Sequence, residues 1–288
     1  MMTFIDQIRG KKNKIVLSYL GVPAPELLIS DKECISLAFL DVETTGLDKR
    51  NDQIIELAVK VVNVEKTSGK IVSIEGDYES YNDPGFEISD RITQLTGIKN
   101  KDIKGRAIVW GHVDDLISNV DLIVAHNANF DRSFVDRNSV ISVKKVWSCS
   151  VNDIDWLKRG FSSSKQELLC YWHGFFFDAH RAMNDIDALI NLLTHSSYTS
   201  KRPIIELIQN SQKDQYIILA ENFSYNEKKK EIIKRNKYMW NPDHKVWYKN
   251  VSEDSIEAEK KILAATIYDN VFQGRVKKID PTDKYKPI

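Results

Sequence analysis

Two acidic side chains lie where an apolar stretch of the chain ends. Asp41 and Glu43 follow residues 34–39, whose apolar and β-branched composition predicts a buried strand. Side chains alternate along a strand, so both carboxylates project to the same face. Two acids on one face repel each other unless a cation lies between them. The pair is therefore a candidate cation site, although a solvated acidic strand end would read the same way.

A third acid follows another predicted strand. Residues 121–126 form an apolar run, and Asp131 lies near the start of the helix that comes next. Strand followed by helix is the α/β pattern, in which active-site groups gather at the carboxyl ends of the strands. Asp131 is thus placed to meet Asp41 and Glu43. A single aspartate near a helix start is, however, more often a helix cap.

A histidine and a fourth acid flank the start of a later helix. Residues 181–193 have the apolar period of a helix, with His180 before them and Asp185 within them. Five residues correspond to roughly 140° on an ideal helix, so the two side chains share a face only if His180 precedes the first turn. We therefore place His180 on the entering loop and Asp185 on the helix, while noting that a lone histidine there is usually structural.

The elements that would position these residues alternate between strand and helix. Short turns join the first strand to two more, which implies antiparallel pairing, and the later elements follow an α/β pattern. Further strands are expected at 53–64, 70–81 and 146–149, and helices at 92–98 (capped by Gly97), 106–119, 164–173 and 204–210.

Composition describes an ordinary globular chain. It has 288 residues and a formal net charge of zero, so nucleic-acid binding would depend on local patches. Cys34, Cys149 and Cys170 form no C-x-x-C pair, which suggests a reducing compartment and neither a disulfide scaffold nor a zinc site. No apolar run is as long as a membrane span. Residues 11–20 faintly imitate a signal peptide, but we interpret them as a cytosolic leader and expect a cytoplasmic protein with no membrane partner.

Three segments together resemble a known family. Residues 39–47 (FLDVETTGL), 125–131 (AHNANFD) and 180–185 (HRAMND) resemble the three motifs of the DEDDh 3′→5′ exonucleases, and residues 95–98 also match. The resemblance covers about residues 35–195 and is greatest to the proofreading epsilon subunit of bacterial DNA polymerase III and its free-standing relatives. It implies an α/β, ribonuclease H-like fold: a mixed five-stranded sheet with helices on both faces.

The resemblance also implies a reaction and a site. Asp41, Glu43, Asp131 and Asp185 would hold two divalent metal ions, Mg²⁺ or Mn²⁺, and His180 would be the general base. The substrate would be nucleic acid with a free 3′ end, preferably single-stranded DNA, cleaved to nucleoside 5′-monophosphates. The substrate-binding residues would be Thr44, Thr45, Gly46, Leu47, His126, Asn127 and Phe130.

Two alternatives remain at this stage. An exoribonuclease would share the same five residues, because discrimination depends on contacts to the 2′-hydroxyl that no motif reveals. A non-catalytic binding module on the same fold is the other, since fold alone never proves activity. The intact acids and histidine argue against that module. The sequence identifies no protein partner.

The remaining chain is divided around this domain. We expect an N-terminal extension at 1–33, the exonuclease domain at 34–198, a linker at 199–212, a small aromatic and basic α+β domain at 213–275 and a flexible tail at 276–288. Residues 228–249 carry eight basic and two acidic side chains, a net charge of +6. Basic charge interleaved with aromatics is typical of single-strand binding, although the tryptophans could equally form the core of so small a domain. The candidate contacts are Lys234, Arg235, Lys237, Trp240, Lys245 and Trp247.

Overall fold

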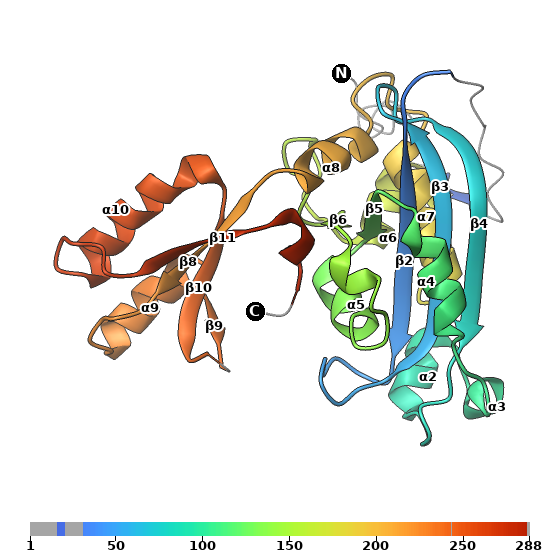
Figure 1. Cartoon of the computed structure of the whole chain (residues 1–288), viewed down its shortest axis with the longest axis horizontal. Helices are drawn as coiled ribbons and strands as arrows, with labels where there is room; N and C mark the ends of the chain where they lie inside the picture. Colours follow the sequence, from blue (N-terminus) through green and yellow to red (C-terminus); the bar gives the residue numbers. More distant parts are fainter. Residues whose placement is uncertain (1–15, 21–30, 243, 287–288) are drawn as a thin grey trace. The chain divides into compact units, whose positions relative to one another are not determined.

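The computed structural model describes residues 16–20, 31–242 and 244–286 (Figure 1). The chain divides into two compact units, the first consisting mainly of residues up to Ser211 and the second of Gln212–Lys284. No helix in the described part of the chain has the length and apolar character needed to cross a membrane.

The first unit is built on a mixed five-stranded sheet of order β4-β3-β2-β5-β6. Strands β4, β3 and β2 pair antiparallel, whereas β2, β5 and β6 pair parallel. This arrangement confirms the predicted sheet and its antiparallel start. The strands are β2 (Cys34–Thr44), β3 (Ile54–Glu65), β4 (Ile71–Tyr81), β5 (Leu122–Ala125) and β6 (Trp147–Cys149).

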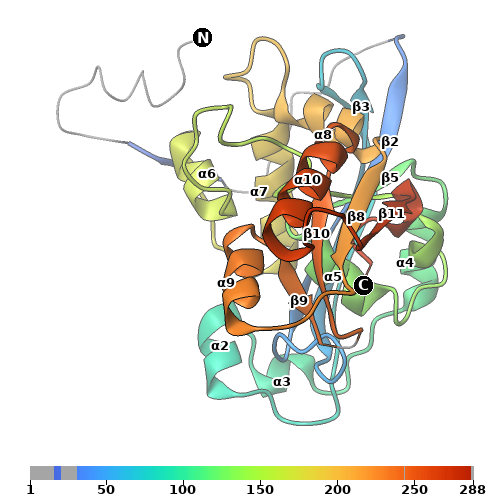
Figure 2. The same ribbon diagram turned by 90° about the vertical axis from the view of Figure 1, so that its left-hand side faces the viewer.

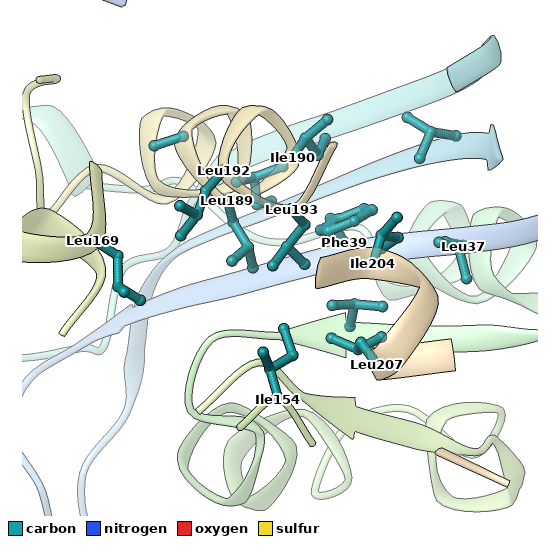
Figure 3. Close-up of a cluster of buried hydrophobic side chains, with 14 of the residues drawn as sticks. Leu37, Phe39, Ile154, Leu169, Leu189, Ile190, Leu192, Leu193, Ile204 and Leu207 are labelled. Atoms are coloured by element: carbon teal, nitrogen blue, oxygen red, sulfur yellow. The ribbon is translucent and has the colours of Figure 1, made fainter. Parts of the chain in front are cut away.

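Helices cover both faces of this sheet. On one face α4 (Trp110–Ser118) and α5 (Ala128–Val135) bury apolar side chains against Leu40 and Val42 of β2. On the other, α6 (Gln166–Trp172), α7 (Ala182–Thr194) and α8 (Pro203–Ser211) form a second cluster. Figure 3 shows Leu189 and Leu193 of α7 and Ile204 of α8 gathered beside Phe39 of β2. Since α8 belongs to this core, the predicted linker at 199–212 is wrong for residues 203–211.

Two predictions for the connecting segments fare differently. Helix α2 (Asp90–Thr96) ends at Gly97, whose φ of 73° lies in the left-handed region, so the predicted glycine cap is confirmed. The helix predicted at 106–119 begins only at Trp110. The N–H groups of Ile108 and Val109 donate to Asn82 Oδ1 and Tyr78 Oη, and these side-chain acceptors hold the preceding backbone outside the helix. The short helices α3 (Asn100–Ile103) and η1 (Ser142–Lys144) complete this region.

Part of the predicted N-terminal extension joins the first unit. Strand β1 (Ser18–Tyr19) pairs in parallel with β7 (Phe175–Phe176). The Tyr19 hydroxyl donates to Asp178 at 2.8 Å, and its ring lies 5.3 Å from that of Phe176. Residues 1–15 and 21–30 of the extension, which include the first half of the predicted leader, lie outside the described residues.

The second unit has the element order β-α-β-β-α-β. Its four strands form an antiparallel sheet of order β11-β8-β10-β9. Helices α9 and α10 pack on the same face of that sheet, and Figure 2 shows them in front of β8 and β10. The elements are β8 (Gln215–Ala220), α9 (Glu227–Arg235), β9 (Met239–Asn241), β10 (Val246–Val251), η2 (Glu253–Ser255), α10 (Ile256–Ile267), β11 (Arg275–Ile279) and η3 (Pro281–Asp283).

The predicted flexible tail from residue 276 is wrong where β11 forms. Arg275 pairs with Leu219 and Ile279 with Gln215, so β11 completes the sheet beside β8. The strand reads RVKKI, and lysines on an edge strand are a common protection against further pairing. Their polarity hid the strand from a reading based on apolar runs.

Candidate active site

Three carboxylates from two elements meet at the end of β2. Ligand oxygens of Asp41, Glu43 and Asp185 lie within 4.8 Å of one another. The first two come from β2 and project to one face, as predicted, and Asp185 comes from the first turn of α7. All three side chains are partly accessible. The geometry therefore brings together three of the four acids expected from the sequence.

Asp131 lies beside this group without being part of it. Its side chain, on α5, is only 3% exposed, and its Oδ1 accepts the N–H of Val42 at 3.2 Å. Val42 separates Asp41 from Glu43, so this bond ties α5 to the strand that carries both acids. Asp131 also acts electrostatically on Asp41 and Glu43. The fourth acid is thus a neighbour of the cluster, outside the 4.8 Å group.

Burial and crowding disfavour the charged forms of these acids. Burial, reinforced by the charge of Asp185, raises the pKa of Glu43 to about 8. Burial likewise raises the pKa of Asp131 and of Asp185 to about 7. The pKa of Asp41 lies well above its usual range because of burial and the neighbouring carboxylates. Such a cluster suits a divalent cation, which would offset the repulsion, and its all-oxygen donor set matches hard ions such as Mg²⁺ or Mn²⁺.

His180 occupies the loop that enters α7, as the sequence predicted. Its φ of 65° lies in the left-handed region, which is uncommon for a residue other than glycine. The next residue, Arg181, donates its N–H to Asp185 Oδ2 at 3.1 Å, and the N–H of Asp185 donates to Arg181 O at 3.0 Å. The strained loop and the acid on the helix are therefore held by reciprocal bonds.

Glu56 and Arg181 form a support that sequence reasoning missed. Glu56, 1% exposed on β3, lies opposite Glu43 in the strand register. It accepts from Arg181 Nη2 at 2.9 Å and from the N–H of Ala182 at 3.0 Å. Arg181 Nη2 also donates to Tyr81 Oη at 2.7 Å. The available signal was a lone acid in the apolar run IIELAV, which only a buried partner allows.

The loop after β2 holds the predicted TTGL residues in a network around Asp52. Thr45 Oγ1 donates to Asp52 Oδ1 at 2.7 Å, whereas Thr44 Oγ1 donates to Gly46 O at 2.6 Å. A Cβ on Gly46 would lie 2.5 Å from Asp52 Oδ2, so the loop requires glycine there. Leu47 is 82% exposed and free to contact a ligand.

The remaining substrate-binding predictions lie around the start of α5. His126 Nδ1 lies 2.7 Å from Ser150 Oγ, and burial lowers the pKa of His126 to about 4, so its ring is neutral at pH 7. Asn127 is exposed at the N-cap of α5. The Phe130 ring packs 5.0 Å from that of Phe134. Contact of these residues with substrate remains a prediction.

Lys49 is another residue that sequence reasoning missed. Its amine donates to Asn129 O at 3.0 Å and also contacts Asn129 Oδ1. Burial lowers the pKa of Lys49, an effect that Asp131 opposes. The lysine therefore brings a positive charge near the fourth acid. No motif marked it, because it lies in the polar loop after the first motif.

The residues predicted for nucleic-acid contact in the second unit separate into two groups. Lys234, Arg235, Lys237, Trp240 and Lys245 are exposed. Trp247 is 8% exposed and packs in the core with Ile218 and Ile233. The prediction of Trp247 as a direct contact is therefore wrong, because so small a unit needs this ring for its core.

The comparison with protein families decides the assignment. A family model described as "Exonuclease" matches residues 38–193, more than half of the 288 residues. The chain belongs to this family. This match confirms three expectations that the motifs raised. The chain is a member of the DEDDh 3′–5′ exonucleases, it is an exonuclease by enzyme class, and it has a ribonuclease H-like fold.

Curated relatives of this exonuclease are much longer proteins. It is 33% identical over 130 residues to the PolC-type DNA polymerase III of Thermotoga petrophila, covering 44% of this chain and 8% of the relative. With the PolC-type DNA polymerase III of Clostridium perfringens it shares 29% over 205 residues, covering 66% of this chain and 14% of the relative. The matched region is thus a small fraction of each polymerase.

Solved structures give a weaker likeness. Exonuclease X in complex with 5′ overhanging duplex DNA aligns with a TM-score of 0.42 and 21% identity, covering 59% of this chain and 99% of that one. The zinc-bound E. coli exonuclease I in complex with single-stranded DNA aligns with a TM-score of 0.48 and 15% identity, covering 65% of this chain and 48% of that one.

Proposed function

We propose that this protein is a metal-dependent 3′→5′ exonuclease that removes nucleoside 5′-monophosphates from single-stranded DNA. The observation that carries the proposal is the cluster of Asp41, Glu43 and Asp185 within an exonuclease family domain. The names of the relatives, which are DNA polymerases, favour DNA over RNA as the substrate.

The carboxylates would hold two divalent ions, Mg²⁺ or Mn²⁺. Asp41, Glu43 and Asp185 offer the oxygens that already converge, and Asp131 is buried against the backbone between the first two. Bound ions of this kind stabilise the charge that develops on the phosphodiester oxygens and lower the pKa of water. The raised pKa values of the four acids describe the metal-free protein, in which Arg181, Lys49 and backbone N–H groups offset burial and repulsion only in part.

The chain's own residues supply the remaining steps. His180 would take the proton of the attacking water, a contribution of typically 10²–10⁴-fold. Glu56 would keep Arg181, and with it the loop of His180, in place. Leu47 and the loop around Gly46 would receive the terminal nucleotide, since this loop is rigidly bonded through Asp52 and leaves Leu47 exposed.

Release of mononucleotides from a 3′-end-labelled oligomer tests the proposal. The full chain is incubated with single-stranded DNA and with RNA of matching sequence, each with Mg²⁺, with Mn²⁺ and with EDTA. We expect release from DNA that depends on either ion and stops in EDTA. Release that persists in EDTA would contradict the metal dependence, and faster release from RNA would contradict the substrate.

A further inference from the structure

The second unit presents an aromatic side chain that its fold does not need. Trp240 on β9 is 46% exposed, although its ring lies 5.4 Å from that of the buried Trp247. The two residues are directly opposite in the β9–β10 register. The core beneath is already filled by Trp247, Tyr238 and Ile233. Trp240 therefore covers the core from outside and leaves much of its ring in solvent.

Trp240 lies on an edge strand of the second unit's sheet. Strand β9 is the last in the order β11-β8-β10-β9, so in the described part of the chain only β10 pairs with it. Met239, the neighbour of Trp240, points to the other face of the sheet and is 48% exposed. Large apolar side chains thus flank the edge on both faces. Exposed aromatics on an accessible edge are the groups on which bases stack.

Three exposed basic side chains lie just before or just after β9 in the chain, and none has an acidic partner among the described residues. Arg235 is the last residue of α9, Lys237 lies between α9 and β9, and Lys245 lies in the turn from β9 to β10. All three are exposed, and among the described residues none forms an ion pair. Lys230, Lys234 and Lys249 differ, because they pair with Glu227, Glu231 and Glu259, respectively. Arg235, Lys237 and Lys245 therefore offer exposed positive charge close to Trp240 in the chain.

The helix-free face of the same sheet is a poorer binding surface. It carries the aliphatic side chains of Ile217, Leu219 and Val246, with Tyr248 as its aromatic member. Single-strand binding combines a charged groove with stacking rings. The β9 edge has both, with Trp240 as the ring and Arg235, Lys237 and Lys245 as the charges.

We propose that the edge formed by Trp240, Arg235, Lys237 and Lys245 binds single-stranded DNA. A base stacks on Trp240, and the three cations contact the phosphates. The inference rests on the proposed function for its biological meaning: a strand held here is tethered to the exonuclease domain, which raises its effective concentration there. The binding itself needs no catalysis.

The first test replaces the ring. Binding of a long thymidine oligomer to the full chain is measured in EDTA, which prevents cleavage. Loss of one stacked base corresponds to roughly a 5- to 150-fold weaker affinity, and we expect such a loss in Trp240→Ala. The matched control is Tyr225→Ala, which removes another exposed aromatic beyond the opposite end of α9 and should bind like the wild type.

The second test replaces the charges and leaves the ring in place. Arg235→Gln, Lys237→Asn and Lys245→Asn are combined, asparagine being chosen because both lysines have positive φ. Three lost phosphate contacts should reduce the slope of log affinity against log salt by about 2. The control removes three charges elsewhere on the unit: Lys213→Gln, Lys261→Gln and Lys277→Gln. We expect the control to keep the wild-type slope.

The outcomes separate this inference from the proposed function. An unchanged affinity and slope in both edge variants would overturn the inference, as would equal losses in the control triple. Tighter binding of a matching RNA oligomer would overturn the choice of DNA. If the wild type binds through this edge but releases no nucleotide with Mg²⁺ or Mn²⁺, the proposed function fails and the binding edge stands. Thermal unfolding of each variant verifies folding, and the charge triple alone decides the matter if Trp240→Ala unfolds.

Discussion

The guanidinium of Arg181 donates to the buried carboxylate of Glu56 through both Nε, at 3.1 Å, and Nη2, at 2.9 Å. Arg181 lies between His180, on a backbone with φ of 65°, and the first residue of α7. Glu56 also accepts the N–H of Ala182, so β3 fixes both the loop and the start of the helix. A buried carboxylate beside the cluster of Asp41, Glu43 and Asp185 is tolerated because a guanidinium and a backbone donor satisfy it.

Glu56→Gln should therefore slow turnover, although residue 56 makes no contact with the substrate in the proposed mechanism. Removing the charge weakens the bonds to Arg181, which holds His180 and Asp185 in position. We expect kcat to fall by about 10-fold or more with KM little changed, and stability to fall by about 1–3 kcal/mol.

The matched control for Glu56 is Glu65→Gln, at the other end of β3. Glu65 is also a buried acid with a lysine partner, Lys32. This variant should lose comparable stability and keep its kcat. Equal kcat losses in the two variants would mean that Glu56 acts only through global stability. Calorimetric titration with Mn²⁺ gives a second readout, in which Glu56→Gln should bind the ion more weakly than Glu65→Gln.

Neighbouring aspartates on α7 offer a comparison for the metal ligands. Asp185→Asn removes one of the three convergent carboxylates, whereas Asp187→Asn removes an acid that pairs with Lys60 outside the cluster. We expect Asp185→Asn to abolish nucleotide release and to weaken Mn²⁺ binding, and Asp187→Asn to retain both. Wild-type turnover of Asp185→Asn at ordinary Mg²⁺ concentrations would remove Asp185 from the site. The same loss is expected for Asp41→Asn, Glu43→Gln and Asp131→Asn.

The raised pKa values predict how metal-free stability varies with pH. A carboxyl group whose pKa is higher in the folded state than in the unfolded one binds more protons when folded, so stability falls as pH rises. The pH range over which stability falls runs from about 4, the ordinary pKa of a carboxyl group, to the pKa values of about 7 for Asp185 and about 8 for Glu43.

Urea denaturation in EDTA at several pH values between pH 5 and pH 8, within the range given above, checks this prediction. Asp41→Asn should stabilise the protein relative to wild type, and the gain should be larger at pH 8 than at pH 5. Saturating Mn²⁺ should reverse the order, because only the wild type keeps the full ligand set. A difference that does not depend on pH would mean that the four acids do not interact when the metal is absent.

His180 should contribute to rate and not to metal affinity. A general base works only when it is deprotonated, so log kcat of the wild type should rise with pH on the acid side. His180→Ala should bind Mn²⁺ normally, turn over typically 10²–10⁴-fold more slowly and lose that rise. Full activity with an unchanged pH profile would make His180 structural. The assay uses a substrate with a poor leaving group, so that the chemical step stays rate-limiting during the measurement.

Local patterns placed the individual residues on their elements, and the resemblance to the DEDDh exonucleases predicted that they form one site. Asp41 and Glu43 share a face through the two-residue period of β2, and His180 was placed on the loop by the helical period that follows it. Glu56 and Arg181 were missed because their contact joins residues 125 positions apart. Periodicity reports which face is buried, and it carries no information about which buried polar groups pair.

The second unit shows a different limit. The apolar run at 215–220 predicts a strand and residues 226–236 predict a helix, and the structure has β8 (Gln215–Ala220) and α9 (Glu227–Arg235) there. Strand β11 was missed, since only Val276 and Ile279 of its five residues are aliphatic and its pairing with β8 is the reason that it is a strand. The sequence left open whether Trp240 and Trp247 contact nucleic acid or form the core of the small domain. The β9–β10 register places both on one face, and burial separates them.

A glycine pair tests the rigidity of the loop that would receive the terminal nucleotide. A methyl group on Gly46 would lie 2.5 Å from Asp52 Oδ2, the atom that accepts the N–H of Asp48 at 2.7 Å. Gly46→Ala must therefore displace Asp52 and disturb the hydrogen bonds that hold the loop. We expect KM for the single strand to rise at least several-fold.

On α4, Gly111→Ala has no atom within 4 Å of the new methyl group and should stabilise the helix by about 0.5–1 kcal/mol with unchanged kinetics. The cause is isolated by adding Asp52→Ser to Gly46→Ala: if the clash is responsible, the double variant loses clearly less than the sum of the two single losses. Additive losses would show that Gly46 and Asp52 act independently and that the close approach does not shape the loop.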